Sequence, residues 1–167
     1  MDKYIGLDMD SKKTVCHALV PGVKESSTTV GADVLSLLAY FERERQGGYR
    51  LHAAFEVSGQ AGFLYDALKA SVDSLHVANP YQMTWIYRTP KKNDRIDARK
   101  MAVLLSIGEL PEVYMPSREV RQWRQTILHR QKIVHKVGQV KNRIRAALQS
   151  EGYRAPEHGG SWWKRSN

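Results

Sequence analysis

The order of apolar patterns in the first 110 residues restricts the fold of this chain more than any other feature. Three short β-prone runs come first, and strand and helix patterns then alternate. The predicted strands cover residues 3–9, 14–20, 23–30, 49–55 and 74–78. The predicted helices cover residues 32–46, 63–68, 81–87 and 91–105. Because such alternation places helices on the faces of a sheet, we expect a mixed α/β domain over residues 1–110.

A second pattern begins near Ser117. Apolar residues there recur at steps of three, four or seven, which is the spacing of a coiled-coil seam. The seam residues are Val120, Trp123, Ile127, Val134, Val137, Ile144 and Leu148, with Arg130 and Lys141 at the two remaining positions. Residues 117–150 are therefore predicted to form one helix of about 50 Å, through which two or more copies of the chain would associate. Residues 151–167 show no periodicity, and we expect a flexible tail there.

Charge is divided unevenly along the chain. Residues 1–90 contain 9 Lys or Arg and 10 Asp or Glu, whereas residues 91–167 contain 17 and 7. The balances of −1 and +10 predict a polyanionic partner for the second half, most often nucleic acid. An anionic membrane is the weaker alternative, because the basic segment has no clean face of bulky apolar residues.

Composition excludes several classes of protein. No uncharged apolar run approaches the roughly 18 residues of a membrane span, and the acidic start MDKYIGLDMD is unlike a signal peptide. Cys16 is the only cysteine, which excludes an intrachain disulfide and a cysteine-based zinc cage. We expect a cytoplasmic, nucleoid-associated protein with no membrane partner.

Four carboxylates are the candidates for chemistry. Asp8 lies near the end of the first predicted strand and Glu56 ends another, and a charge in such apolar runs is costly unless it is paired. Asp94 and Asp97 lie three apart at the start of a predicted helix and so share one face. If the four converge, their repulsion calls for a divalent cation, and oxygen ligands suit Mg²⁺ or Mn²⁺.

Simpler interpretations exist for each of these acids. An Asp at a helix N-terminus is favoured by the helix dipole alone, which could account for Asp94 and Asp97. Asp10 shares a sheet face with Asp8 by strand alternation. We prefer Asp8 because it is closer to the buried part of the strand, and we expect Asp10 to be solvated.

Basic side chains surround the aspartate pair and continue along the predicted long helix. Between residues 118 and 145 there are nine Lys or Arg and one acid, Glu119, whereas a solvated helix usually interleaves the two signs. We therefore expect contacts with phosphates, although salt bridges at the helix start would also explain the first group. The candidates are Lys91, Lys92, Arg95, Arg99, Lys100, Arg121, Arg124, Arg130, Lys132, Lys136, Lys141, Arg143 and Arg145.

Four pieces of sequence, in order, carry a family resemblance. They are YIGLD (4–8), FEVSG (55–59), VANP (77–80) and KNDRIDAR (92–99). Together they resemble the N-terminal DEDD domain of the "one-ten" insertion-sequence transposases, relatives of the Piv pilin-gene invertases, over about residues 3–150. The resemblance implies an RNase H-like, RuvC-like fold, with Asp8, Glu56, Asp94 and Asp97 as the catalytic metal-binding tetrad. It also implies a helical coiled coil joining protomers, and a structured guide RNA that brings target and donor DNA together.

One departure from the family pattern affects the expected activity. Members of the family have a C-terminal domain with a serine resembling a recombinase nucleophile, and no such motif occurs in these 167 residues. We therefore expect this chain to hold metal and bind nucleic acid without completing strand exchange alone.

Three other functions remain open at this point. A junction-resolving or repair nuclease of the same fold would cut branched DNA with Mg²⁺ and without RNA. An actin-like or sugar-kinase ATPase could also begin with Ile-Gly-Leu-Asp, but residues 9–13 lack the glycine of a phosphate-binding hairpin. In a non-catalytic nucleic-acid scaffold, replacing Asp8 or Glu56 by alanine would change only the stability of the protein.

Overall fold

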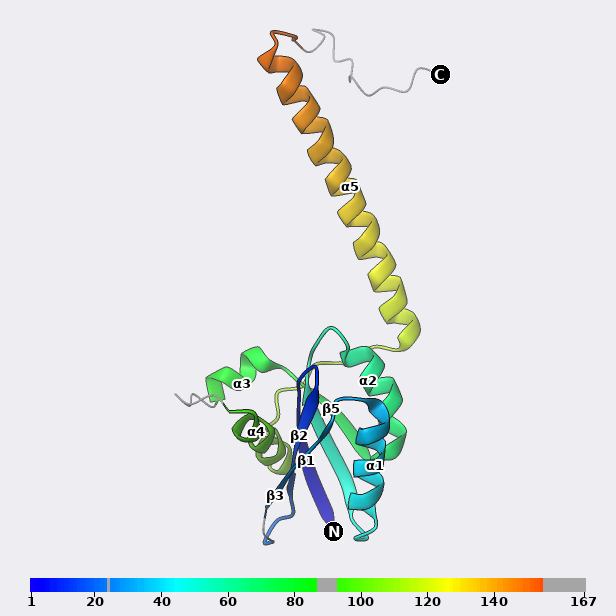
Figure 1. Ribbon diagram of the computed structural model, residues 1–167, viewed down its shortest axis with the longest axis vertical. Coiled ribbons are helices and arrows are strands. Elements are labelled where there is room, and N and C mark those ends of the chain that lie inside the picture. The colour runs from blue at the N-terminus through cyan, green and yellow to red at the C-terminus, as the bar shows by residue number, and fades with distance from the viewer. Residues whose placement is uncertain (24, 87–92, 155–167) are drawn as a thin grey trace. The chain divides into compact units, whose positions relative to one another are not determined.

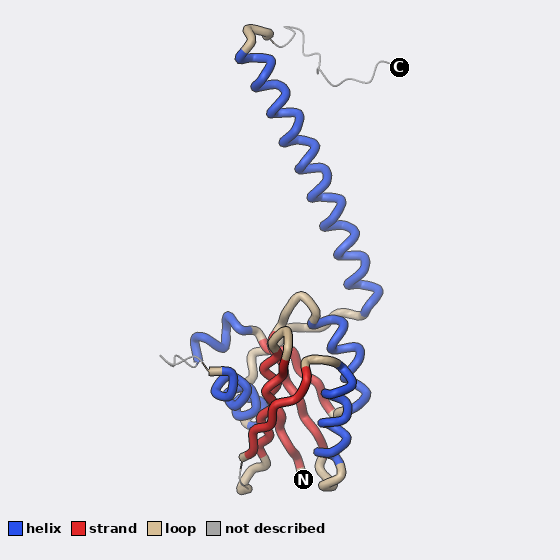
Figure 2. The backbone as a smooth tube through the Cα atoms, viewed as in Figure 1, coloured by secondary structure: helices blue, strands red, loops and turns tan. Residues whose placement is uncertain are grey.

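The computed structural model describes residues 1–23, 25–86 and 93–154, and the chain divides into two compact units, residues 1–118 and 119–167. Each unit is described by itself. The first contains five strands: β1 (Asp2–Met9), β2 (Lys13–Leu19), β3 (Ser26–Gly31), β4 (Arg50–Glu56) and β5 (Ser74–Ala78). Its helices are α1 (Val34–Arg45), α2 (Ala61–Leu68), a 3-10 turn (Lys69–Ser71), α3 (Pro80–Ile86) and α4 (Asp94–Ser106). Figure 1 labels these elements, and Figure 2 colours helices and strands separately.

The five strands form one mixed sheet in the order β3-β2-β1-β4-β5. The first three strands are antiparallel neighbours, whereas β4 runs parallel to β1, and β5 runs parallel to β4. Chain reversals within the first 31 residues explain the antiparallel part, and the helical crossovers explain the parallel part. The predicted mixed sheet with flanking helices is thereby confirmed, and this strand arrangement is the RNase H-like one implied by the resemblance.

Helices cover both faces of the sheet (Figure 1). On one face, Ile5 and Leu7 of β1 pack in a buried cluster with side chains of α1 and α2, such as Phe41 and Leu64. On the other face, a second cluster contains Ala54 of β4 together with α4 residues. Alternation along the strands therefore assigns odd-numbered residues of β1 and β4 to the α1–α2 face and even-numbered residues to the α4 face.

Gly6 allows α4 to approach the central strand unusually closely. A Cβ atom built at Gly6 would lie 1.9 Å from the backbone oxygen of Ala98 and 2.9 Å from the nitrogen of Ala102. Only a residue without a side chain fits between strand and helix at this point. The contact fixes the beginning of α4 against β1 two residues before Asp8.

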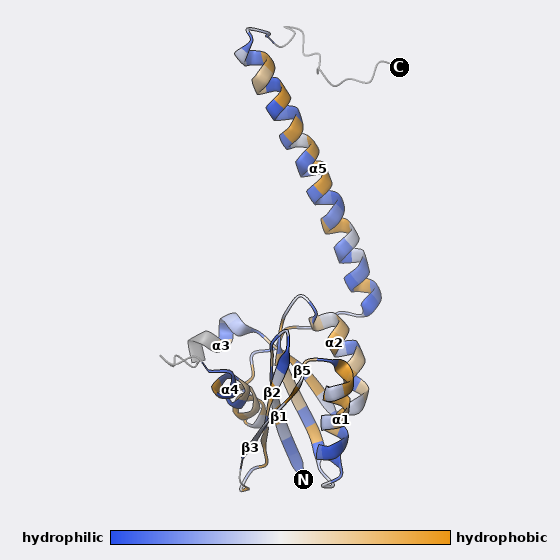
Figure 3. Cartoon of the chain, viewed as in Figure 1, coloured by the Kyte–Doolittle hydropathy of each residue, from blue (hydrophilic) through white to orange (hydrophobic). Residues whose placement is uncertain are grey.

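The second unit consists chiefly of α5 (Arg118–Ser150), a helix of 33 residues. None of its residues is buried, and its apolar side chains are open to solvent in the isolated chain. Figure 3 shows hydrophobic residues recurring between hydrophilic ones along α5. The predicted long basic helix is confirmed, and none of the residues that the structure describes buries its apolar seam.

The predicted elements are all present, with ends that differ by a few residues. The third strand begins at Ser26 rather than at Val23, because Val23 belongs to a turn in which its N–H donates to the Val20 carbonyl and Gly22 has a φ of 79°. No helix among the described residues is long and apolar enough to cross a membrane.

Candidate metal centre and nucleic-acid interface

Asp8 and Glu56 lie at the ends of two neighbouring parallel strands. The β1–β4 register ends with Leu7 paired to Phe55, so Asp8 and Glu56 follow side by side, one residue further along. Both have even numbers and belong to the α4 face of the sheet. Both residues are half-buried, whereas Asp10 is exposed, as expected of a solvated neighbour.

Asp94 and Asp97 occupy the first turn of α4. Asn93 caps this helix by accepting a hydrogen bond from the Arg95 N–H at 3.1 Å, so the aspartates lie where the helix dipole favours negative charge. Because Gly6 holds Ala98 against β1, the turn that contains both aspartates begins near the same end of β1 as Asp8.

Each aspartate of α4 is paired with a lysine. Lys13, at the start of β2, places its Nζ 3.0 Å from Oδ2 of Asp94, and Lys100 places its Nζ 3.1 Å from Oδ1 of Asp97. The hydrogen bond to Asp94 is the main cause that raises the pKa of Lys13, and the charges of Asp94, Asp10 and Asp8 add to it. Lys13 therefore lies in the field of acids from two elements, a role that the sequence pattern did not indicate.

The four predicted acids are thus placed near one end of the sheet without being gathered around one point. Within the described ranges, no three His, Cys, Asp or Glu side chains are close enough to hold a metal ion. The ammonium groups of Lys13 and Lys100 neutralise part of the negative charge that a bound metal cation would otherwise neutralise.

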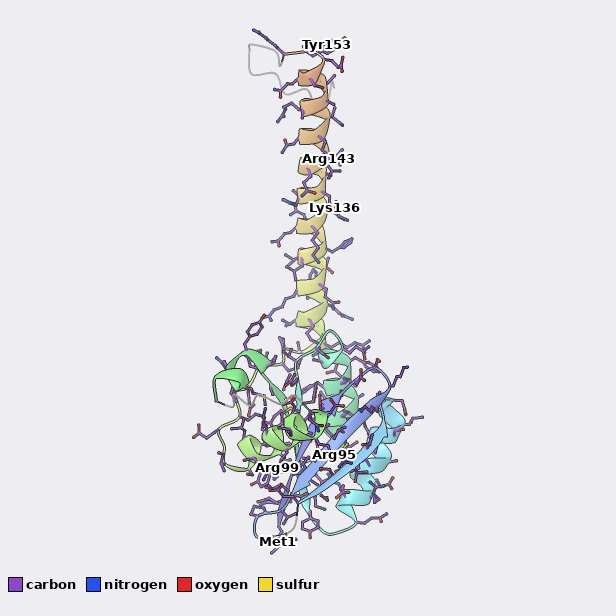
Figure 4. All side chains as sticks on the ribbon, turned by 60° about the vertical axis from the view of Figure 1, so that its left-hand side comes forward. Met1, Arg95, Arg99, Lys136, Arg143 and Tyr153 are labelled. Carbon is purple, nitrogen blue, oxygen red and sulfur yellow. The ribbon has the colours of Figure 1, made fainter. Side chains whose placement is uncertain are left out.

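Some cations around the aspartate pair form ion pairs with carboxylates, and others face the solvent. Arg99 is paired with Glu25, its Nε 2.6 Å and its Nη2 2.9 Å from the carboxylate oxygens, and this contact is the main cause that lowers the pKa of Glu25. Lys100 is engaged with Asp97, while Arg95 is exposed on α4 (Figure 4). The predicted candidates Lys91 and Lys92 lie outside the described residues.

Glu25 also contacts a buried histidine that sequence reasoning did not single out. His17 is 5% exposed, with Nε2 3.1 Å from Glu25 Oε2 and Nδ1 2.8 Å from Ser27 Oγ. Burial lowers the pKa of His17, against the opposing effect of the Glu25 charge. The group Arg99–Glu25–His17 joins α4 to the antiparallel edge of the sheet. The predicted phosphate-binding residue Arg99 is therefore engaged in a structural ion pair.

The other predicted cations project from α5. Arg121, Arg124, Arg130, Lys132, Lys136, Lys141, Arg143 and Arg145 belong to this helix. Lys136 and Arg143 are labelled in Figure 4. Most are exposed, Arg121 and Lys141 being half-buried, and together they give a positive surface about 36 Å long.

Comparison with known proteins places these features in a family. The family model described as a transposase, DEDD_Tnp_IS110, matches residues 5–152. Among solved structures, the Thermus thermophilus RuvC structure is similar, with a TM-score of 0.46 and 12% sequence identity over 66% of this chain and 99% of the RuvC chain. No curated protein sequence matches the chain.

Proposed function

The chain belongs to this transposase family, and from that premise we propose that residues 1–118 form a metal-dependent domain acting on DNA phosphodiesters. The proposed ligands and catalytic groups are Asp8, Glu56, Asp94 and Asp97. The observation that supports this most directly is that Asp8 and Glu56 directly follow the paired residues Leu7 and Phe55 at the ends of two neighbouring parallel strands, together with the close packing of α4 at Gly6.

The donor set suits Mg²⁺ or Mn²⁺, because carboxylate oxygens are the ligands that hard divalent cations prefer. Such an ion would neutralise charge at the phosphate and activate the attacking oxygen. Asp94 and Asp97 would first have to leave the ammonium groups of Lys13 and Lys100. Until a cation replaces them, the two ammonium groups neutralise part of the charge of the aspartates.

Mn²⁺ binding, measured by calorimetry on the full chain, tests the metal site. Asp8→Asn and Glu56→Gln should each weaken binding at least about tenfold, because each removes a charged ligand. Asp10→Asn is the matched control and should leave the affinity unchanged. Lys13→Met should strengthen binding, since no ammonium then competes for Asp94. Equal affinities for Asp8→Asn and the unaltered protein would exclude the metal site and leave a nucleic-acid scaffold.

A junction nuclease is the alternative use of the same acids. We expect the chain with Mg²⁺ and without RNA to leave a four-way DNA junction intact, because the proposed recombination activity depends on a guide RNA. Cleavage that disappears in Asp8→Asn would favour the nuclease.

The cations of α5 support a second part of the proposal, which is nucleic-acid binding along this helix. Phosphate contacts release counterions, so affinity should fall steeply as KCl rises. The triple variant Arg121→Gln, Arg124→Gln and Lys132→Gln should reduce the salt slope by about 2 to 3. Arg43→Gln, an exposed change on α1, should leave the slope unaltered. A slope that is flat in the unaltered protein would argue for protein contacts instead.

We also propose that one of the bound nucleic acids is a structured guide RNA, as the family resemblance implies. Labelled DNA duplex and RNA hairpin should then be retained together in one complex by the full chain. Mutually exclusive binding of the two would contradict this part of the proposal.

The apolar seam of α5 supports association between copies of the chain. Trp123 and Val134 are 62% and 58% exposed, which is a large apolar exposure for a helix without a partner. Val134→Glu should abolish self-association in analytical ultracentrifugation, whereas Gln125→Glu, the same charge change outside the seam, should not. Association that survives Val134→Glu would place the interface elsewhere.

A further inference from the structure

A shallow apolar groove lies along the second half of α5. It has a volume of about 380 Å³ and is lined by Ile133, Lys136, Val137, Val140, Lys141 and Ile144. Its four apolar side chains are each at least 40% exposed. The first half of the helix presents exposed apolar side chains of its own, at Val120, Trp123 and Ile127. A second copy of α5 that runs in the opposite direction would bring these side chains to the groove.

The coiled-coil repeat shows which side of α5 is apolar. We label its seven positions a to g, with Val120 at a and Trp123 at d, so that the seam consists of positions a and d. Between residues 120 and 150 the g positions beside the seam have no charge, and they are Thr126, Ile133, Val140 and Ala147. The e positions on the other side of the seam are Arg124, Gln131, Gly138 and Arg145. The apolar surface is therefore widened on the g side only.

A parallel pair of helices would place like charges together in the seam. Identical positions then form each layer, so Arg130 would face Arg130 of the second copy, and Lys141 would face Lys141. The seam positions from Val120 to Leu148 include no acid that could neutralise these two layers. Both layers would hold paired cations away from water, which is costly.

The flanks of a parallel pair are equally poorly matched. Positions g and e then lie beside each other, which places Val140 of one copy against Arg145 of the other. The same arrangement permits an ion pair between Glu119 and Arg124 at the first turn of the helix. Because both side chains are exposed, that ion pair contributes little.

An antiparallel pair that crosses at residue 132 separates the seam cations. Each a position then faces a d position, because the two chains run in opposite directions. Two-fold symmetry forms four kinds of layer, which are Val120 with Ile144, Trp123 with Lys141, Ile127 with Val137, and Arg130 with Val134. Each seam cation thus faces an apolar or aromatic side chain. A shift of one heptad would either place Lys141 against Arg130 or leave Ile144 beyond the overlap.

We propose that two copies of α5 pack antiparallel and cross at residue 132, with Trp123 of each copy against the Lys141 side chain of the other. This inference rests on the self-association proposed above and specifies its direction and register. A lysine stem can lie on apolar surface while its ammonium faces an aromatic ring. Lys141 is half-buried and lines the groove that receives Trp123 of the second copy.

The g positions extend the same interface. In an antiparallel pair they lie beside each other, so Ile133 contacts Ile133 of the second copy near the crossing, and Val140 contacts Thr126. The e positions meet on the opposite flank, where Gln131 lies beside Gln131 of the second copy. The uncharged g side chains are thereby gathered on one flank of the pair, whereas a parallel pair would divide them between both flanks.

The antiparallel pair leaves much of the positive surface of α5 open. Arg121, Lys132 and Arg143 occupy positions b, f and c, which point away from the seam. Association and nucleic-acid binding therefore use different sides of the helix. The two copies of Val120 lie about 36 Å apart along the pair, because Val120 of one copy is level with Ile144 of the other.

Distances between spin labels on the full chain test the direction of the two helices. The label is attached to Ala146→Cys, at an f position outside the seam. Burial raises the pKa of the natural Cys16 to about 12, so this thiol does not compete for the label near neutral pH. Two labels at residue 146 should lie at least about 42 Å apart in the antiparallel pair, whereas in a parallel pair they would be level and roughly 25 Å apart. Pulsed electron spin resonance at high KCl, which screens the repulsion between basic helices, measures this distance.

A mixed sample of Ala146→Cys and Arg118→Cys is the matched control. Residues 118 and 146 are both f positions and are level with each other in the antiparallel pair, so this sample should contain a distance of roughly 25 Å. A short distance between two labels at residue 146 would overturn the antiparallel arrangement and leave self-association intact. A protein that sediments only as a monomer would instead refute the self-association on which this inference rests.

A double-mutant cycle on the dissociation constant of the pair tests the register. Because Trp123 and Lys141 of different copies are in contact, Trp123→Leu and Lys141→Gln should not act independently. The double variant should dissociate at least about threefold less than the product of the single effects requires. Trp123→Leu and Arg130→Gln, which lie in different layers, should combine independently. Independent effects of Trp123→Leu and Lys141→Gln would overturn the register.

Discussion

The sheet domain and α5 contain similar apolar residues but differ in what covers them. In the domain, Ile5, Leu37 and Phe41 are completely buried between strands and helices. Along α5, Trp123 and Val134 remain more than half exposed. The domain therefore obtains its stability from its own core, whereas α5 depends on helix propensity until another molecule covers its seam.

The charges of the two regions reinforce this difference. Acids and bases in the domain are paired across elements, as Lys3 with Glu44 and Arg99 with Glu25. Residues 118–145 have nine bases and one acid, so two copies of α5 repel each other in the absence of a polyanion. A nucleic acid that neutralises these charges would favour association as well as bind.

A glycine-to-alanine change in each region should give the clearest contrast. Gly6→Ala places a Cβ against the Ala98 backbone, and we expect the free energy of unfolding of the domain to fall by about 3 kcal/mol or more. Gly138→Ala meets no atom within 4 Å and should stabilise α5 by about 1 kcal/mol. Urea unfolding followed by circular dichroism measures both, and a tolerated Gly6→Ala would disprove the close packing of α4.

Shortening one apolar side chain in each region should distinguish the buried core of the domain from the exposed seam of α5, because the first change should affect stability and the second self-association. Leu37→Ala should destabilise the domain by about 2 to 5 kcal/mol, because it leaves a cavity in a closed core. Val137→Ala should leave the stability of the dilute, unassociated chain nearly unchanged and weaken self-association instead. A large loss of stability for Val137→Ala in dilute solution would mean that α5 is covered within one chain.

Salt should change the self-association of α5 more than it changes the stability of the domain. Raising KCl screens the repulsion between basic helices, so self-association of the protein without nucleic acid should strengthen modestly. The domain, whose core is apolar, should change little. Sedimentation at two salt concentrations measures the first effect and urea unfolding the second, and weaker association at high salt would indicate that ion pairs hold the copies together.

The smallest expected effect concerns His17. Because burial lowers its pKa below the ordinary 6.5, the unfolded chain takes up a proton there before the folded chain does. This contribution to the stability of the domain is complete above about pH 6.5 and is lost as pH falls through the folded value. Unfolding measured from pH 7.5 to 5 should show it, and the slope should diminish in His17→Gln but not in His129→Gln, an exposed change on α5.

The sequence by itself determined the order of elements, the long basic helix and the family. Periodicity and turn residues act locally, so the strands around Ile5 and Ala54 and the whole of α5 could be predicted from neighbouring residues. The positions of Asp8 and Glu56 at strand ends followed from the same patterns. The role of these acids as metal ligands remains a proposal.

Only the tertiary structure decided which side chains meet. The pairing of Lys13 with Asp94 joins residues 81 positions apart, and the ion pair of Arg99 with Glu25 joins residues 74 positions apart. The packing of Ala98 on Gly6 likewise requires the sheet to be assembled first. Such contacts depend on strand register and helix placement, which many distant residues set together, and so no local pattern in the sequence contains them.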